Sequence, residues 1–534
     1  MIPPQDLVSI STLTEDVSKG IVSLDDTSST SSQELGIGKE ITVCSISVEK
    51  ISQSARSSTS SPIKTSYTGA NCLRIQQSLL ILVHLHLLKR FSKASCEDTN
   101  DYHLLLLTLI QRLHTFAKKV GYVSRHFFES ALLAIKQFFQ TNTFDIFPEN
   151  LPHLCSFASF FGAKVQSVFV YVYGSFNVEQ FSHCFNLISG LQLNLDNHND
   201  LEFLNKASYY FPRLKQLDVI ASISNSISIP LIELLKVNTT ITCLCLWNNS
   251  LEDKGVRALA DALKVNTTLT SVNLCENSIG ANGAKALADT LKVNTTLTRV
   301  DLENNSIGDE GATALADALK VNDRLTRIGL YMNYIGDEGA IALAEALKVN
   351  NTVTTVNLGQ NSIGAEGAKA LADALKVNTT LTSVNLYMNF IGDEGARTLA
   401  EALTVNIAVT CVDLCNNSIG FEGVKSLSEA LKINNSVVEL CLGANSIGDH
   451  GAKALAATLK INNKLTNISL FYALIGDEGA IALANALKCN STVSSIDIGN
   501  NTIGDEGVRA FAETMTINGI VTIEGVDLPV NVIN

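Results

Sequence analysis

The sequence predicts an α/β solenoid with the shape of a horseshoe, in which a parallel inner β-sheet is backed by outer helices. Two observations carry this prediction. Residues 241–520 divide into ten consecutive repeats of equal length, and each repeat joins a strand-like stretch to an amphipathic stretch of helix length. Composition marks the same segment, because residues 241–520 lack proline whereas residues 1–240 hold seven of the eight prolines.

Three segments precede the regular array. Residues 1–70 contain 25 Ser or Thr and few large apolar side chains, which predicts a disordered tail. Residues 71–150 contain three apolar-rich stretches of helix length, which predict a small α-helical region. Residues 151–240 show strand-like triplets of apolar residues at irregular intervals, and we expect irregular N-terminal repeats or a cap there.

Repeat two, residues 269–296, shows how one repeat is expected to fold. Val272 and Leu274 alternate with polar residues, as in a strand with one buried face. Asn277 recurs at the same place in nearly every repeat, where its amide can satisfy loop backbone groups and form a stacked ladder. Acidic residues at many helix starts match the helix dipole. One buried helical stripe is expected from Ala284, Leu287, Ala288 and Leu291.

A single repeat cannot bury enough apolar surface to fold alone, so the repeats must stack on one another. Numbered from one to ten, they start at Ile241, Leu269, Leu297, Leu325, Val353, Leu381, Val409, Val437, Leu465 and Val493. The end of such a stack needs a cap. Residues 521–534 are expected to supply it, because Ile523, Val526 and Leu528 keep the strand spacing until Pro529.

The string LxxLxLxxNxIGxxGAxxLAxALKxN, exemplified by residues 269–294, resembles the ribonuclease-inhibitor-type (RNI-like) leucine-rich repeat. The array is similar to the C-terminal repeat region of nucleotide-binding leucine-rich-repeat (NOD-like) receptors, which implies protein recognition in innate-immune or signalling regulation. It is also similar to the Ran GTPase-activating protein. That alternative implies stimulation of a small GTPase, for which Arg299 and Arg327 are the candidate arginines.

Several functions are not expected. The nearest string to a nucleotide-binding P-loop, around Gly38-Lys39, has Gln33 and Glu40 at required Gly and Ser/Thr positions. A net charge of −13 argues against nucleic acid as a partner. The most apolar run is about 11 residues, too short for a membrane span. With no export signal visible, we expect a reducing, cytoplasmic location.

Cys243-x-Cys245 and Cys411-x3-Cys415 lack the paired CxxC spacing of a zinc site and have no histidine nearby, so we expect free thiols, no metal and no cofactor. With no catalytic constellation to argue, the predicted function is a non-enzymatic scaffold for a protein partner.

The inner face is the expected binding surface, because positions three, five, seven and eight of each repeat vary while the structural positions recur. Large aromatics and Met on an exposed sheet resemble interface anchors. The alternative is passive inheritance of the Tyr-Met-Asn-aromatic string by duplication between repeats four and six. The concave-face candidates are Trp247, Glu276, Arg299, Asp301, Glu303, Arg327, Tyr331, Met332, Tyr387, Met388, Asp413, Phe471 and Tyr472.

Charges at these positions favour a basic partner surface. These positions hold six acidic and two basic residues, which gives a net charge of −4. The alternative is an acidic face that serves only solubility. Repeat nine departs from the pattern, because Ala473 stands in the ladder asparagine position directly after Phe471 and Tyr472.

Overall fold

The computed structural model describes most of the repeat array and little of what precedes it. The chain divides into two compact parts, Met1–Arg125 and His126–Asn534, and every described residue belongs to the second. The predicted tail, nearly all of the predicted helical region and most of the predicted C-terminal cap lie outside the described residues. The described ranges are 143–146, 167–173, 188–195, 212–221, 228–517 and 522–525.

The second part is built on one parallel sheet of 15 strands that follow one another in chain order. Its first strand, β1 (Thr143–Ile146), lies within the residues predicted to be helical and pairs with β2 (Ser167–Tyr173). The sheet therefore starts earlier than expected. The alternating sequence TFDI suits a strand but is too short to stand out from its helix-like surroundings. The strands β3 (Ile188–Leu195) and β4 (Gln216–Ala221) coincide with the other irregular triplets.

The remaining strands are short and regular. They are β5 (Cys243–Cys245), β6 (Ser271–Asn273), β7 (Arg299–Asp301), β8 (Arg327–Gly329), β9 (Thr355–Asn357), β10 (Ser383–Asn385), β11 (Cys411–Asp413), β12 (Glu439–Cys441), β13 (Asn467–Ser469), β14 (Ser495–Asp497) and β15 (Thr522–Glu524).

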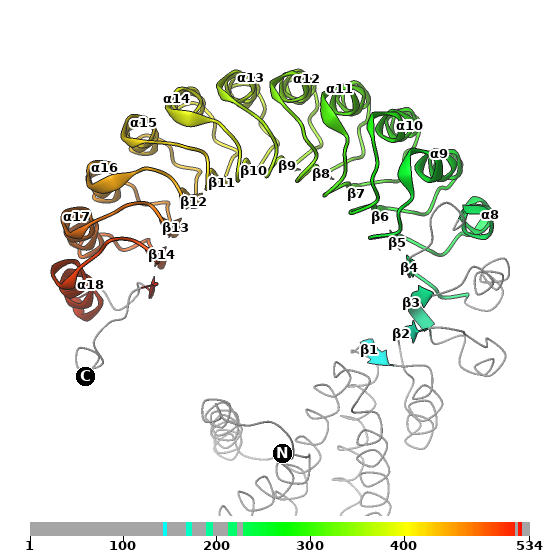
Figure 1. Cartoon of the computed structure of the whole chain (residues 1–534), viewed down its shortest axis with the longest axis horizontal. Coiled ribbons are helices and arrows are strands. Elements are labelled where there is room, and N and C mark those ends of the chain that lie inside the picture. Colours follow the sequence, from blue (N-terminus) through cyan, green and yellow to red (C-terminus); the bar gives the residue numbers. More distant parts are fainter. Residues whose placement is uncertain are drawn as a thin grey trace, which may run out of the picture. The chain divides into compact units, whose positions relative to one another are not determined.

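A helix precedes each of these regular strands. The helices are α8 (Ser228–Val237), α9 (Glu252–Leu263), α10 (Ala281–Leu291), α11 (Gly308–Leu319), α12 (Asp337–Leu347), α13 (Ala365–Leu375), α14 (Gly392–Leu403), α15 (Phe421–Leu431), α16 (Gly448–Leu459), α17 (Asp477–Leu487) and α18 (Asp505–Ile517). The strands lie along the inner curve and the helices along the outer curve, which is the predicted solenoid (Figure 1).

The core is a thin layer between sheet and helices. Strand pairing keeps the period of the repeats, as in Val272 opposite Val300, so equivalent side chains stack from repeat to repeat. The middle residue of each regular strand is buried, and so is the predicted helical stripe from Ala284 to Leu291. These two rows of small and branched side chains pack against each other.

The predicted asparagine ladder closes the loop after each of the strands β5–β14 except β13. The Asn277 amide donates to the carbonyls of Leu246 (2.7 Å) and Cys275 (2.9 Å), while its oxygen accepts the N–H groups of Asn249 (3.1 Å) and Leu251 (3.3 Å). The side chain is fully buried. It therefore satisfies backbone groups of the preceding repeat that water cannot reach.

A second asparagine ladder, which sequence reasoning did not assign, closes the loops after helices α9–α17. Asn294 donates to the carbonyl of Leu263 (2.7 Å) and accepts the N–H groups of Thr296 (2.9 Å) and Leu297 (2.8 Å). The corresponding bond to the preceding repeat recurs at Asn266, Asn322, Asn350, Asn378, Asn406, Asn434, Asn462 and Asn490. Both ends of a regular repeat are thus tied to the repeat before.

Aspartates at the helix starts bind the next repeat rather than only their own helix dipole. Asp309 Oδ1 accepts the N–H groups of Gly336 (2.7 Å) and Gly339 (2.9 Å) at the start of the following helix. Such a carboxylate acts as an N-cap supplied by a neighbour. The other aspartates with this pair of contacts are Asp253, Asp337, Asp393, Asp449 and Asp477.

The aspartate decides the backbone conformation of the next helix start. Gly336, which the Asp309 carboxylate binds, has an extended conformation with φ −99°. Repeats two, five and seven have Ala281, Ala365 and Phe421 at the aspartate position. The glycines at the following helix starts, Gly308, Gly392 and Gly448, adopt the left-handed conformation with φ of 60°, 59° and 60°. Without the carboxylate, the Gly308 N–H donates to the Asn333 carbonyl at 2.9 Å.

Replacing Asn277 by Ala should destabilise the array strongly. The change leaves two carbonyls and two N–H groups buried without the amide, which costs about 2–4 kcal/mol in the free energy of unfolding. Urea denaturation measures the loss. The matched control is Asn282→Ala, an exposed asparagine on α10 of the same repeat, which should change stability by less than about 0.5 kcal/mol. Equal effects of the two changes would contradict the ladder's role.

Replacing Asp309 by Ala should cost about 1–2 kcal/mol, the usual loss of a helix N-cap. The Gly336 and Gly339 N–H groups lose their acceptor, so their hydrogen exchange should accelerate while that of α11 stays unchanged. Glu310→Ala is the control, because Glu310 is exposed and makes only a surface ion pair with Lys285 at 3.0 Å. Unchanged exchange at Gly336 would contradict the N-cap assignment.

Candidate functional site

The predicted contact residues mostly line the concave side of the sheet, with different exposures. Trp247 and Met388 are each 40% exposed and Tyr472 is 58% exposed. Intermediate exposure is found for Glu276, Glu303, Arg327, Tyr331, Met332, Tyr387, Asp413 and Phe471, while Arg299 is exposed. Asp301 differs from the prediction, because only 4% of it is exposed. Asp301 therefore has a structural role, and its carboxylate is not free to contact a partner.

Two tyrosines from repeats four and six form one aromatic pair. The Tyr331 and Tyr387 rings stack with centroids 6.4 Å apart and planes 11° from parallel. Repeat five lies between them and has Gly359 at the equivalent position. A Cβ on Gly359 would stand 2.9 Å from Tyr331 Cδ2, so the ring occupies the space that a side chain there would need. The Tyr331 hydroxyl donates to Gln360 Oε1, which fixes the ring further.

Position eight of every regular repeat has a left-handed backbone. Asparagine tolerates this conformation and stands there in repeats one, three, seven and ten. The bulkiest exceptions are Met332, Met388 and Tyr472, with φ of 55°, 55° and 49°. Each of these three follows directly on an aromatic residue at position seven. Bulky residues at a costly backbone conformation mark these three repeats as functional candidates.

Position ten adds residues that the sequence reasoning missed. Repeats four, six and nine carry Tyr334 (69% exposed), Phe390 (67%) and Leu474 (61%) there, whereas the other repeats carry Ser or Thr. The signal was present, since Tyr334 and Phe390 belong to the Tyr-Met-Asn-aromatic string. We call the residues at positions seven, eight and ten of repeats four and six the aromatic edge; they are Tyr331, Met332, Tyr334, Tyr387, Met388 and Phe390.

The two candidate arginines share one buried carboxylate. Arg299 Nε donates to Asp301 Oδ2 at 2.7 Å, and Arg327 Nε lies 3.4 Å from Asp301 Oδ1. The Arg299 and Arg327 side chains remain 48% and 39% exposed. Asp301 thus neutralises part of the positive charge and holds both guanidinium groups against the sheet, so neither extends freely as a catalytic arginine finger would.

A polar bridge spans repeats three to five. Glu303 Oε1 accepts the Asn357 amide at 2.9 Å, although 54 residues separate them. Gly329 lies between, and a Cβ there would meet Glu303 Oε1 at 3.0 Å. This arrangement repeats the tyrosine pair in polar form: two side chains meet over a glycine of the intervening repeat.

Repeat nine also places its aromatic residue over a glycine. The Phe471 ring lies against Gly443 of repeat eight, and it makes an edge-on contact with Tyr472 at 6.2 Å between centroids. Ala473 is fully buried in the ladder position, where it cannot donate an amide to the preceding repeat. Asn501 of repeat ten still accepts the Ala473 N–H at 2.9 Å, so the ladder resumes after the interruption.

The described thiols on the inner face are mostly unreactive. Burial raises the pKa of Cys275 to about 12 and that of Cys411 to about 11. A thiol rather than a thiolate is therefore present at neutral pH, which limits oxidation.

Burial also raises the pKa of Asp218 on β4 to about 6, although the Gln216 amide donates to both of its oxygens at 3.2 Å and opposes the shift.

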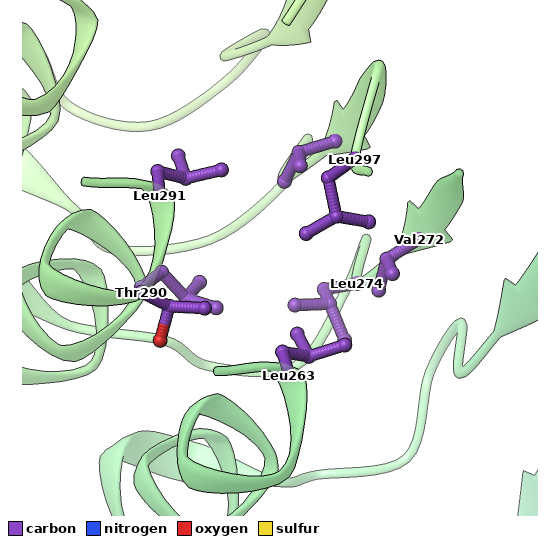
Figure 2. A pocket seen from close by; sticks show the side chains of 8 residues that line it. Leu263, Val272, Leu274, Thr290, Leu291 and Leu297 are labelled. Atoms are coloured by element: carbon purple, nitrogen blue, oxygen red, sulfur yellow. The ribbon is translucent and has the colours of Figure 1, made fainter. Parts of the chain in front are cut away.

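One small cavity lies in the core between repeats one and three (Figure 2). Its volume is about 10 Å³, room for at most one water molecule. The lining is apolar apart from Thr290, whose hydroxyl donates to the carbonyls of Ala260 and Ala286 at 3.0 Å. This cavity is a packing gap and not a ligand site.

The fold and this surface define an array of leucine-rich repeats, and comparison with family models agrees. The family described as Leucine Rich repeat matches residues 349–372, 377–400, 462–484 and 489–512. The family described as TMOD/LMOD Leucine-rich domain matches residues 212–336. The chain therefore carries leucine-rich repeats, while its RNI-like subtype and its NOD-like receptor resemblance stay predictions. No curated protein matches the chain.

Solved structures give partial similarities. An internalin from Listeria monocytogenes is 18% identical, with 62% of this chain and 89% of that chain covered and a TM-score of 0.38. Leiomodin-1 Actin-Binding Site 2 is 23% identical over 28% of this chain and 87% of that chain, with a TM-score of 0.25. The tropomodulin C-terminal domain from Caenorhabditis elegans is 17% identical over 28% and 93%, with a TM-score of 0.25. None of the described helices combines the length and hydropathy needed to cross a membrane.

Replacing Asp218 by Asn should stabilise the protein at pH 7. The folded-state pKa of about 6 lies above the unfolded value near 3.8, so the ionised carboxylate is disfavoured in the folded state. That penalty is complete above about pH 6 and vanishes below about pH 4. We expect Asp218→Asn to gain roughly 1–2 kcal/mol at pH 7, after discounting for partial exposure, and nothing at pH 4. A pH-independent gain in urea denaturation would contradict the assignment.

Proposed function

We propose that the chain is a non-enzymatic scaffold that binds a protein partner on the concave face of its repeats, with the aromatic edge at the centre. The observation that carries this proposal is the Tyr331–Tyr387 stack over Gly359. Tyr is enriched among the residues that dominate binding energy in protein interfaces. A pair already held by stacking loses little side-chain entropy when a partner binds.

The surroundings of the aromatic edge favour a partner with an apolar contact rimmed by basic groups. Met332 and Met388 add polarizable, adaptable contact area next to the tyrosines. With Asp301 paired to both arginines, the carboxylates of Glu276, Glu303 and Glu439 remain on the same face at intermediate or high exposure. Their charge supports a basic rim on the partner.

The alternative, stimulation of a small GTPase, has less support. It requires an arginine or a positioning residue that reaches the nucleotide of the GTPase. The two candidate arginines are both bound to Asp301. The role in innate-immune or signalling regulation likewise stays a prediction from resemblance.

The double change Tyr331→Ala/Tyr387→Ala tests the proposal. Full-length protein is immobilised, captured proteins are identified, and the dissociation constant of each is measured. Purified actin is one protein to test for binding, because the leiomodin fragment similar to part of this chain is an actin-binding site. Removal of the two tyrosine rings should weaken the affinity for the specific partner by at least about 2 kcal/mol, roughly 30-fold.

The control is Phe421→Ala, which removes a 36%-exposed aromatic side chain from an outer helix, α15. It should leave affinity unchanged. A second variant, Gly359→Ala, keeps both tyrosines but places a Cβ in the space occupied by the Tyr331 ring, and it should weaken binding by disturbing the pair. Equal affinity of wild type and the double variant, with both folded by circular dichroism, would exclude the concave aromatic edge as the binding site.

A further inference from the structure

Three metal-binding side chains from neighbouring repeats converge on the concave face. Asp413 ends β11, Cys415 follows two residues later, and Cys441 ends β12. One carboxylate oxygen of Asp413 and the two sulfur atoms all lie within 4.8 Å of one another. Ligands about 2.0–2.3 Å from a shared tetrahedral Zn²⁺ are roughly 3.3–3.8 Å apart, so the observed separations need only small rotamer adjustments to reach that geometry.

The sheet holds the three groups in place. Asp413 and Cys441 are direct partners in the register of β11 and β12. The Cys415 N–H donates to Asp413 Oδ1 at 3.0 Å, which orients the carboxylate beside the sulfur. Such a hydrogen bond to a metal-binding carboxylate is the usual outer-shell support of a metal site.

The surroundings favour a thiophilic cation. Only 4% of Cys415 is exposed, and the Phe471 ring covers Gly443, the residue beside Cys415 in the next repeat. The carboxylates of Glu439 and Asp497 act on the same cluster and make it negative. The Cys415 and Cys441 side chains lie within hydrogen-bonding reach of each other.

We propose that Asp413, Cys415 and Cys441 bind Zn²⁺ or a similar thiophilic divalent cation. Two thiolates and one carboxylate supply three ligands, and the fourth tetrahedral position on the open concave side takes water or a donor atom from a bound partner. Both cysteines bind the metal as thiolates, and the thiol protons that they release go to solvent. The ion cross-links repeats seven and eight, because its ligands come from two adjacent strands.

A second group of cysteines in the same array provides an internal control. Cys243, Cys245 and Cys275 also lie on the inner side of adjacent repeats. Among the described residues, however, these cysteines do not belong to any group of three possible metal ligands as close together as those of the proposed site. Cys245→Ser therefore removes a comparable inner-face thiol without touching the proposed ligands.

The experiment titrates the full-length protein with Zn²⁺, and separately with Co²⁺, in a phosphine reductant that keeps thiols reduced. Expected results are one Zn²⁺ equivalent that is absent from the Asp413→Asn/Cys415→Ser/Cys441→Ser variant and a Co²⁺–thiolate absorption band that this variant lacks. Each single change should weaken the affinity by about 10-fold or more, and Cys245→Ser should leave it unchanged. Zn²⁺ should also raise the unfolding temperature of the wild type but not of the triple variant.

Two outcomes overturn the proposal. One is an equal number of bound Zn²⁺ ions in the wild type and the triple variant, which would place all binding at other cysteines of the chain. The other is a loss of affinity in Cys245→Ser as large as that in Cys441→Ser. Circular dichroism shows whether each variant is folded, which distinguishes misfolding from the loss of metal ligands. The metal-site proposal does not depend on the proposed partner binding, because the metal titration needs no partner.

Discussion

Every regular repeat in this protein leaves buried backbone groups that only the adjacent repeat can satisfy, and the rest of the structure depends on this constraint. The side chain of Asn277 bonds backbone atoms of repeat one, and that of Asn294 does the same at the other end of the repeat. An inserted residue would move an amide away from its partners and leave them unpaired in the interior. The constant length of the repeats follows from that cost, and so do the in-register strands.

The same dependence on neighbours governs the helix starts. The sequence predicts that acidic residues there complement the dipole of their own helix. The carboxylate of Asp309 lies in the first turn of its own helix and also accepts two N–H groups of the next helix, to which the same electrostatic argument applies. Gly308, whose preceding repeat has Ala281, has a left-handed backbone, whereas Gly336, whose preceding repeat has Asp309, does not. The conformation of one repeat is thus set by a side chain of the repeat before it.

This coupling explains which features could be predicted from the sequence. Strand residues and the buried helical stripe depend on periodicity within one repeat, and those predictions agree with the structure. Apart from the first asparagine ladder, contacts between repeats were not predictable in the same way. The burial of Asp301 depends on Arg299 beside it and Arg327 in the next strand. Short spacings along the chain do not reveal the convergence of Cys415 and Cys441, because the two cysteines belong to different repeats.

Glycines on the inner face determine which side chains can meet. Adjacent strands lie about 4.8 Å apart, so residues two strands apart are separated by nearly twice that distance. Tyr331 and Tyr387 nevertheless stack at 6.4 Å because Gly359 between them leaves room for the rings to lean together. Gly329 allows the same approach between Glu303 and Asn357. These two side-chain pairs are therefore built from repeats n and n + 2, with the intervening glycine as an essential part. A side chain added at that glycine alters the surface as surely as removal of an aromatic ring.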